Sequence, residues 1–367
     1  MGLIAVVASL VAATQGAATG HRTGNELWRA ADGGFAAWTH DGTAPGRGGG
    51  VRLAGEARSG DVVSPVVPTG LPAREAIPSW NAATPPGTWV EARLRARVAG
   101  RWTRWYELGS WSSREAARRH SVDGQRDARG RVLTDTLALA GAADALQLGL
   151  RLRSARDGAS PSVRAAALAW SQAAARPSAH PAGDRSRWAT ALEVPEYSQM
   201  VYPDGGNVWC SPTAVSMVLA YWQRYRGPAE PRVRRTVRGV YDREYRGHGN
   251  WAFNVAYAAT EGMQARVARF ESFRDVERWV DAGVPVVFSF AWARGELRGA
   301  AGSSDGHLAV VVGFDRRGNP IVNDPAARSN RAVRRTYPRR TLERLWLQHS
   351  GGTVYLIHPP THRVPQS

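Results

Sequence analysis

The chain contains a single cysteine, Cys210, among its 367 residues. One cysteine cannot form a disulfide within the chain, so cysteine usage gives no indication of an oxidising compartment. The histidines do not indicate a metal site either, because they show no metal-ligand spacing with carboxylates or further cysteines. The thiol is therefore free for chemistry of its own, or for a structural role as a small buried hydrophobe.

Lysine is absent altogether, so the formal net charge of +17 comes from arginine alone. Clusters at 232–235, 334–335 and 339–340 would suit a polyanion such as nucleic acid or an acidic wall polymer. The alternative is a solvated surface in a chain whose Arg, Ala, Gly and Pro are abundant together, as under a codon bias. We favour that alternative and expect no nucleic-acid partner, because the clusters are scattered and no binding motif accompanies them.

Long hydrophobic runs are also missing, apart from one near the N-terminus. Residues 3–13 are apolar, and small residues follow as far as Gly20. The stretch is too short to span a bilayer but suits the core of a signal peptide. The usual positive residues before it are missing, and a buried strand or helix is the alternative. We predict a signal peptide at 1–21, no stable membrane insertion, and a secreted or cell-wall-associated protein.

Residues 22–171 are predicted to form a β-rich accessory domain. Every second residue is apolar in much of 89–98 and 146–152, which predicts strands with one buried face. The stretches 101–108 and 132–137 are predicted as further strands. One-sided strands joined by Gly- and Pro-rich turns indicate an antiparallel, β-sandwich-like fold.

Eight of the fifteen tryptophans lie in this first half. Five of them would form a sugar- or peptide-stacking platform if they were exposed: Trp80, Trp89, Trp102, Trp105 and Trp111. The alternative is that they fill the core or support its edges, and we favour it because large aromatic rings bury so much apolar area.

A linker, a second domain and a tail complete the predicted organisation. Residues 172–189 are rich in Ala, Pro and Ser, which is typical of a linker. The domain at 190–360 contains a predicted helix over 273–282 and a predicted strand over 284–290. Residues 361–367 are the tail. The predicted fold class is α+β.

Cys210 stands at the predicted start of a helix. Apolar residues recur at helical spacing after it, at positions 214, 215, 218, 219 and 222. Pro212 suits the first turn, where the missing N–H costs nothing. A thiol at a helix N-terminus faces the positive end of the helix dipole, which lowers its pKa and favours the thiolate. The position therefore suits a nucleophile.

A histidine and an aspartate follow in an order that suits a base and its orienter. His307 precedes an apolar run, 308–314, that is predicted to be a buried strand. A turn at 315–319 leads to a second short strand at 320–323, and Asp324 ends it. Folding this hairpin brings His307 within a residue or two of Asp324 across the ladder. A carboxylate there would hold the imidazole in one tautomer.

Two further side chains are candidates for the same active site. Gln199, upstream of Cys210, would donate one hydrogen bond to a developing oxyanion, with the Cys210 backbone N–H giving the other. Taken alone, Gln199 would be a solvated loop residue. His248 is a rival base, but no strand and carboxylate follow it, so we expect it to line the cleft. This chemistry requires no metal or organic cofactor.

Together these motifs resemble the papain-like cysteine peptidases of family 39, in their stand-alone form. The matching stretches are 194–199, 207–213, 249–254, 306–308 and 322–325. The resemblance implies a papain-like α/β fold for the second domain. It implies that Cys210 is the nucleophile and His307 the general base and acid. It also implies that Asp324 orients the histidine and that Gln199 donates to the oxyanion. The bacteriocin-processing members are fused to a transporter segment that this sequence does not contain, so cleavage after a double glycine is not carried over.

The prediction is a secreted cysteine peptidase that acts on a peptide or protein, cell-wall peptide included. A cell-wall amidase or a transpeptidase would use the same triad with another bond or acceptor. A binding protein that has lost activity is the third alternative. The intact set of four residues argues against it, since a degenerate member would be expected to lose at least one of them.

Overall fold

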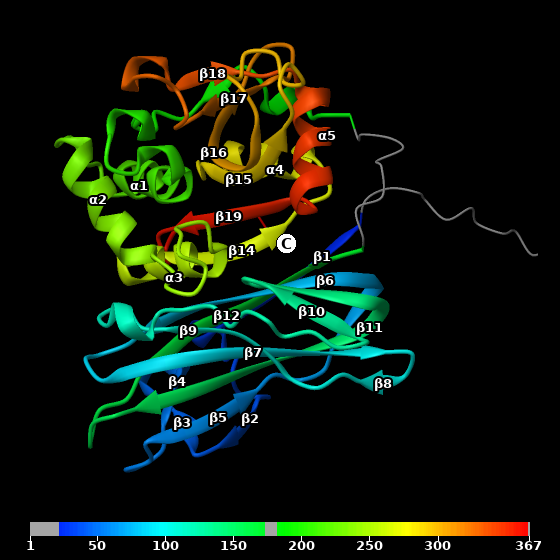
Figure 1. The fold of residues 1–367 in the computed structure, drawn as a ribbon, viewed down its shortest axis with the longest axis vertical. Coiled ribbons are helices and arrows are strands. Elements are labelled where there is room, and N and C mark those ends of the chain that lie inside the picture. The colour runs from blue at the N-terminus through cyan, green and yellow to red at the C-terminus, as the bar shows by residue number, and fades with distance from the viewer. Residues whose placement is uncertain (1–21, 173–181, 366–367) are drawn as a thin grey trace, which may run out of the picture.

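The computed structural model describes residues 22–172 and 182–365 (Figure 1). The predicted signal peptide lies outside these residues, as do 173–181 of the predicted linker and the last two residues of the tail. The described part contains both helices and antiparallel sheets, in agreement with the α+β class. No helix within it is long and apolar enough to cross a membrane.

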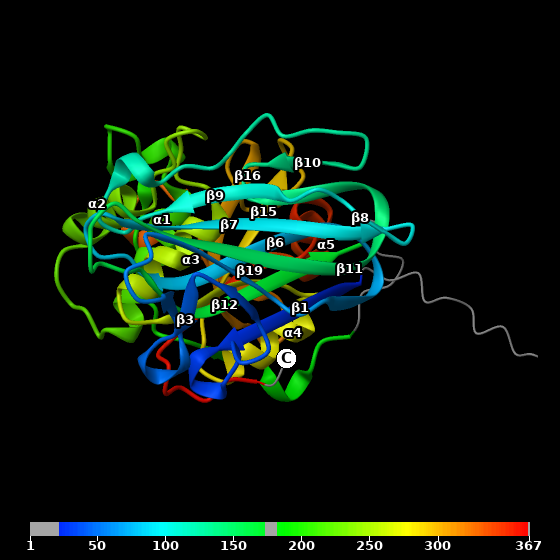
Figure 2. The ribbon, with the colours of Figure 1, turned by 90° about the horizontal axis from the view of Figure 1, so that it is seen from below.

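The first sheet has twelve antiparallel strands, all from the N-terminal half. They are β1 (Thr23–Arg29), β2 (Thr39–Asp41), β3 (Thr43–Pro45), β4 (Val51–Leu53), β5 (Ser59–Val63), β6 (Val67–Ala83), β7 (Thr88–Val98), β8 (Arg101–Trp102), β9 (Tyr106–Trp111), β10 (Gly130–Leu133), β11 (Thr136–Ser154) and β12 (Ser162–Ser171). The long β11 pairs with β6 and β10 in its first part and with β5 and β7 in its second. Hydrogen bonds thus join all these strands into one branched sheet, whose long strands cross the molecule in Figure 2.

The strand predictions hold where apolar residues alternate. Leu146 lies opposite Ala96 and Leu152 opposite Val90, and all four side chains are fully buried. The predicted strand at 101–108 is broken, because Thr103 bonds back to Ala96 and bends the chain between β8 and β9. The predicted strand at 132–137 is also broken, by a tight turn between β10 and β11.

The second sheet has seven antiparallel strands in the order β14-β19-β15-β16-β17-β18, with β13 paired to β16. They are β13 (Thr190–Ala191), β14 (Gln264–Arg269), β15 (Val286–Trp292), β16 (Ser304–Phe314), β17 (Pro320–Asn323), β18 (Arg334–Thr336) and β19 (Thr353–His358). Five helices accompany it: α1 (Cys210–Trp222), α2 (Ala229–Val240), α3 (Trp251–Thr260), α4 (Phe273–Asp281) and α5 (Arg339–Ser350). Helix α1 packs against β16, which lies between β15 and β17. The predicted helix at 273–282 matches α4, and the predicted strand at 284–290 begins two residues later, as β15.

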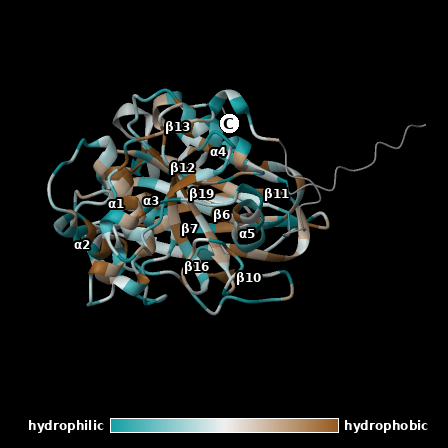
Figure 3. Cartoon of the chain, turned by 90° about the horizontal axis from the view of Figure 1, so that it is seen from above, coloured by the Kyte–Doolittle hydropathy of each residue, from teal (hydrophilic) through white to brown (hydrophobic). Residues whose placement is uncertain are grey.

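The two halves share one apolar core, in which α3 and β14 pack against β6 and β12. The Asn81 side chain bonds both to the carbonyl and to the N–H of Ala265, at 2.5 and 3.1 Å. Asn25 does the same with Arg269, at 2.8 Å for each bond. Hydrophobic stretches gather along the strands near the centre of Figure 3. The N-terminal half is therefore fixed against the second half by buried contacts.

The five tryptophans do not form a stacking platform. Trp80 and Trp111 are buried, and both contact the Phe253 ring of α3. The other three are partly exposed, but a guanidinium covers a face of each ring: Arg118 on Trp89, Arg95 on Trp102 and Arg93 on Trp105. Two of the five rings therefore fill the core and the other three each have one face covered, so the structure favours the alternative of core filling and edge support over a platform of five rings.

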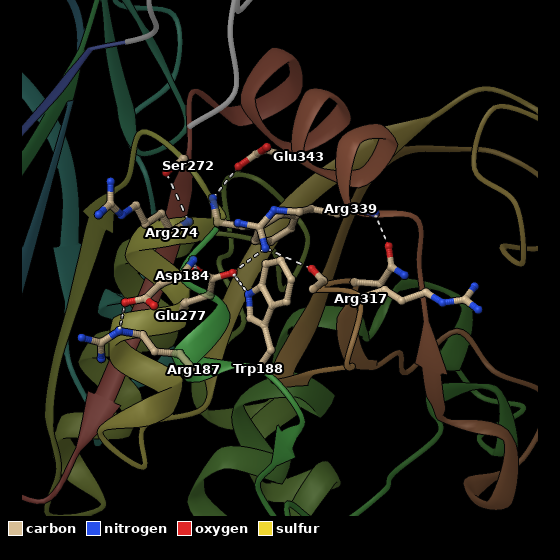
Figure 4. Close-up of polar contacts among 12 residues, drawn as sticks. Asp184, Arg187, Trp188, Ser272, Arg274, Glu277, Arg317, Arg339 and Glu343 are labelled. Carbon is tan, nitrogen blue, oxygen red and sulfur yellow. Dashed lines mark hydrogen bonds and ion pairs between the residues drawn. The ribbon is translucent and has the colours of Figure 1, made fainter. Parts of the chain in front are cut away.

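The described end of the predicted linker is bound to the second half (Figure 4). Glu277 of α4 has no exposed surface and accepts hydrogen bonds from the Asp184 N–H and the Trp188 indole N–H, at 2.7 and 2.6 Å. Its charge is balanced by Arg339 of α5, at 2.5 Å. One buried carboxylate therefore ties the incoming chain to two helices.

We expect Glu277→Ala to lower the free energy of unfolding by about 3–5 kcal/mol, because it leaves a largely buried guanidinium and two donors without their acceptor. Urea denaturation measures the change. Glu193→Ala is the matched control: Glu193 pairs with Arg334 at 3.7 Å, but its side chain is 87% exposed. That variant should lose no more than about 0.5 kcal/mol. Equal losses in the two variants would contradict the anchoring role of Glu277.

Candidate active site

Cys210 is the first residue of α1 and is partly exposed. The backbone N–H groups of Ser211 and Leu308 are directed at its sulfur, as is the side chain of His307. The N-cap residue Trp209 gives no side-chain hydrogen bond to this end of the helix. The orphan N–H of Ser211 therefore turns to the sulfur, and the helix start stabilises negative charge there.

His307 lies in β16, and its side chain is 5% exposed. Its Nε2 is 2.8 Å from Oδ1 of Asp324, which leaves Nδ1 for the contact with Cys210. The rings of Phe290 and Trp292, on the neighbouring strand β15, contact the imidazole edge-on, with centroids 5.4 Å away in both cases. These contacts hold the ring in one orientation between the thiol and the carboxylate.

Asp324 follows β17 directly. Val310 pairs with Asn323, so continuing the antiparallel register places Asp324 two positions before the residue opposite His307, within the one or two residues that the hairpin predicts. Its Oδ1 also accepts from the Ala326 N–H at 2.9 Å, and its Oδ2 from the Tyr337 hydroxyl at 2.5 Å. The neighbouring Asn323 donates instead to the Val194 carbonyl at 3.1 Å. Asp324, and not Asn323, therefore contacts the histidine.

Tyr337 is the member of this cluster that sequence reasoning missed. It comes just after β18, whose Thr336 pairs with Ile321 of β17. The side chain is buried, and the Asp324 carboxylate raises its pKa further above the ordinary value after burial has done so. No motif or apolar period in the sequence distinguishes this tyrosine from the others, because only the β17–β18 pairing brings it to Asp324.

Burial is the largest influence on the ionisation of the pair, and it disfavours charge on both groups. It raises the pKa of Cys210, but the hydrogen bond and charge of His307, with the two backbone N–H groups, bring it below the usual value. Burial lowers the pKa of His307, but the charges and hydrogen bonds of Asp324 and Cys210 raise it to about 10. The pKa of Asp324 is about 2, because its partners outweigh burial. The arrangement favours a thiolate–imidazolium pair at neutral pH.

Gln199 lies in a short 3₁₀ turn, Gln199–Val201, and is 3% exposed. One N–H of its amide donates to the Gly206 carbonyl at 2.6 Å, and its backbone N–H donates to the Pro325 carbonyl at 2.8 Å. Gln199 is therefore tethered to the segment just after Asp324. Its side chain lines the cleft that also holds Cys210 and His307, and the amide carries a second N–H.

The cleft has a volume of about 770 Å³ and receives residues from both halves of the chain. His248 lines it as expected, with its ring against Trp209 and Tyr241, and burial lowers its pKa to about 4. Its Nδ1 has no hydrogen-bond partner among the described residues, so it lacks the carboxylate that a base would need. Within the described ranges, no group of three or more His, Cys, Asp or Glu residues is arranged to hold a metal ion.

Comparison with protein families gives two matches, one for each half. Residues 24–171 match a family described as "Peptidase C39 N-terminal domain", and residues 191–354 match the "Peptidase_C39 like family". No curated protein matches the chain. Among solved structures, the C-terminal CBM6 of LamC, a marine laminarinase from Zobellia galactanivorans, aligns with 40% of this chain and 98% of its own, at 13% identity. Its TM-score of 0.22 is too low for any conclusion about this protein.

Proposed function

The chain belongs to the C39-like peptidase family, and from this premise we propose that it hydrolyses peptide bonds with Cys210 as the nucleophile. The observation that carries the proposal is the position of His307, which contacts the thiol and the Asp324 carboxylate at once. A nucleophile next to a base, with the base oriented by a third group, is the arrangement that covalent catalysis requires.

Each group has a defined step. The thiolate of Cys210 attacks the scissile carbonyl, and the new oxyanion lies between the second Gln199 amide N–H and the Cys210 backbone N–H. The C–N bond breaks as the amine takes a proton from His307. His307 then removes a proton from water, which attacks the thioester, releases the acid and restores the thiolate. The cycle consumes one water and leaves the protein unchanged.

Asp324 and Tyr337 act through the histidine. The carboxylate fixes Nε2 as the protonated nitrogen facing it, so that Nδ1 is the one that exchanges a proton with sulfur and substrate. The Tyr337 hydroxyl holds the other carboxylate oxygen, which keeps the carboxylate ionised and in place. Tyr337 is therefore a positioning residue.

Thiol labelling with iodoacetamide between pH 4 and 9 tests the proposal. The wild-type thiol should react well below the free-cysteine pKa of about 8.5, because His307 supplies the opposing charge. In His307→Ala only burial and the backbone N–H groups remain, so the reactivity should shift to higher pH. His248→Ala should leave the midpoint unchanged, since the His248 ring packs against Trp209 and Tyr241 and not against the sulfur. A thiol that behaves like free cysteine in all three proteins would remove the basis of the proposal.

A further inference from the structure

Large apolar side chains are rarely exposed among the described residues, and most of the exposed ones line one cleft. Six of the described residues qualify: Val66, Leu133, Met200, Val201, Val208 and Tyr245. Four of these six line the cleft that contains Cys210, namely Leu133, Met200, Val208 and Tyr245. Val201 follows Met200 in the same 3₁₀ turn. Such clustering marks a binding surface, whereas single exposed apolar residues need no explanation.

Three of the four belong to the peptidase half and lie next to the proposed catalytic groups. Met200 follows Gln199 directly, and Val208 precedes Cys210 by two residues. Burial raises the pKa of Tyr245, and the charge of the Cys210 thiolate raises it further, which places the phenol near the sulfur. A substrate side chain close to the scissile bond would therefore meet these residues.

The fourth, Leu133, is supplied by the N-terminal half. It ends β10, and Thr134 and Asp135 turn the chain so that Thr136 pairs back to Leu133 in β11. Thr134 has φ = +56°, a conformation that β-branched residues rarely adopt. The turn is held by the buried Asp135 carboxylate, which accepts hydrogen bonds from the Trp251 N–H at the start of α3 and from the Thr136 hydroxyl. Unfavourable backbone that is fixed in this way is typical of functional sites.

We infer that Leu133, Met200, Val208 and Tyr245 form an apolar subsite across the junction of the two halves, which takes a large hydrophobic side chain of the peptide substrate beside the scissile bond. The inference rests on the proposed function. It makes the N-terminal half part of the substrate-binding surface, and Leu133 a specificity-determining residue. Burying a leucine or phenylalanine against these side chains removes apolar surface of both partners from water, which a serine in the same place does not do.

Irreversible peptidyl vinyl sulfones test the subsite without requiring turnover. A serine-containing parent probe is compared with probes that carry leucine at each of the three positions nearest the reactive group. With wild-type protein, leucine at one position should raise the second-order inactivation rate about 10-fold or more. Leu133→Ser and Val208→Ser should each lose most of that preference. Both side chains are exposed, at 46% and 57%, so both variants should fold, and thermal melting verifies this.

Val66→Ser is the matched control, because Val66 is also 46% exposed but does not line the cleft. It should keep the wild-type preference. A preference that is absent from wild-type protein, or that survives in Leu133→Ser, overturns the subsite. Iodoacetamide labelling of the same proteins separates this outcome from failure of the proposed function, which would appear as an unactivated thiol in every one of them.

Discussion

Replacing Cys210 with alanine should abolish peptide hydrolysis, with a loss of at least about 10⁴-fold in kcat. The proposed reaction passes through a thioester, and no other thiol exists in the sequence to form one. The variant should still fold. Cys210 is only partly buried at the start of α1, and alanine is a better helix former than cysteine, so we expect the free energy of unfolding to change by about 1 kcal/mol or less.

The measurement is hydrolysis of a peptide substrate found with the wild-type protein, together with urea denaturation of both proteins. Cys210→Ser is the matched companion, since a hydroxyl replaces the thiol with little change in volume. It should also be strongly impaired, because the ordinary pKa of a serine hydroxyl lies far above that of a thiol. The charge of His307 therefore cannot generate an alkoxide as it generates a thiolate. Retained turnover in a well-folded Cys210→Ala protein would contradict the mechanism and move the nucleophile elsewhere.

The sequence predicted best those features that depend on local periodicity. Alternation of apolar residues located β7 and the second part of β11, and helical spacing after Cys210 located the start of α1. The His307–Asp324 contact was also predictable, because the two strands form a hairpin with a short turn, and the register shift between Val311 and Gly313 changes the pairing by only one residue. Local signals suffice when the contacting residues are close in sequence.

The sequence predicted least where contacts join distant segments. The turn at Thr134 interrupts the stretch 132–137, which looks like one strand in the sequence. The turn is held by Asp135, which accepts a hydrogen bond from the N–H of Trp251, over a hundred residues later. The contact between Tyr337 and Asp324 likewise depends on the pairing of β17 with β18. The contacts of Trp102 and Trp105 with arginines on β7 can be predicted only when the strand pairing of the sheet is known. Each case is a tertiary contact that overrides, or adds to, a local pattern.

These long-range contacts bear on the role of the N-terminal half. Linker composition and a separate β-rich pattern favour an independent accessory module, whose removal would leave the second half intact. The buried bonds of Asn81 and Asn25 to β14, and the capping of α3 by Asp135, make the two halves one packed unit instead. The cleft of this peptidase is therefore lined by residues of both halves, and we expect its shape to depend on both.

The second large effect should follow from Asp324→Ala, which we expect to lower kcat/KM by about 10²- to 10⁴-fold, less than loss of Cys210 or His307. The Asp324 carboxylate is the main group that raises the pKa of His307 against the effect of burial. Without it, that pKa should fall from about 10 toward or below its ordinary 6.5. The thiolate–imidazolium pair exists only below the pKa of the histidine, so the alkaline limb of the pH–rate profile should move to lower pH.

The pH profile distinguishes this effect from simple loss of structure. Asn323→Ala is the comparison, since Asn323 is the adjacent buried residue. Its side chain donates to the Val194 carbonyl and does not contact the histidine. It should lower stability but leave the alkaline limb where it is in the wild-type protein. Tyr337→Phe, which removes one hydrogen bond and keeps the carboxylate, should shift the limb by less than Asp324→Ala does. An unshifted limb in Asp324→Ala, with a shifted one in Asn323→Ala, would transfer the orienting role to Asn323. The order Asp324→Ala, then Tyr337→Phe, then Asn323→Ala in the size of the shift is what the hydrogen-bond network around His307 requires.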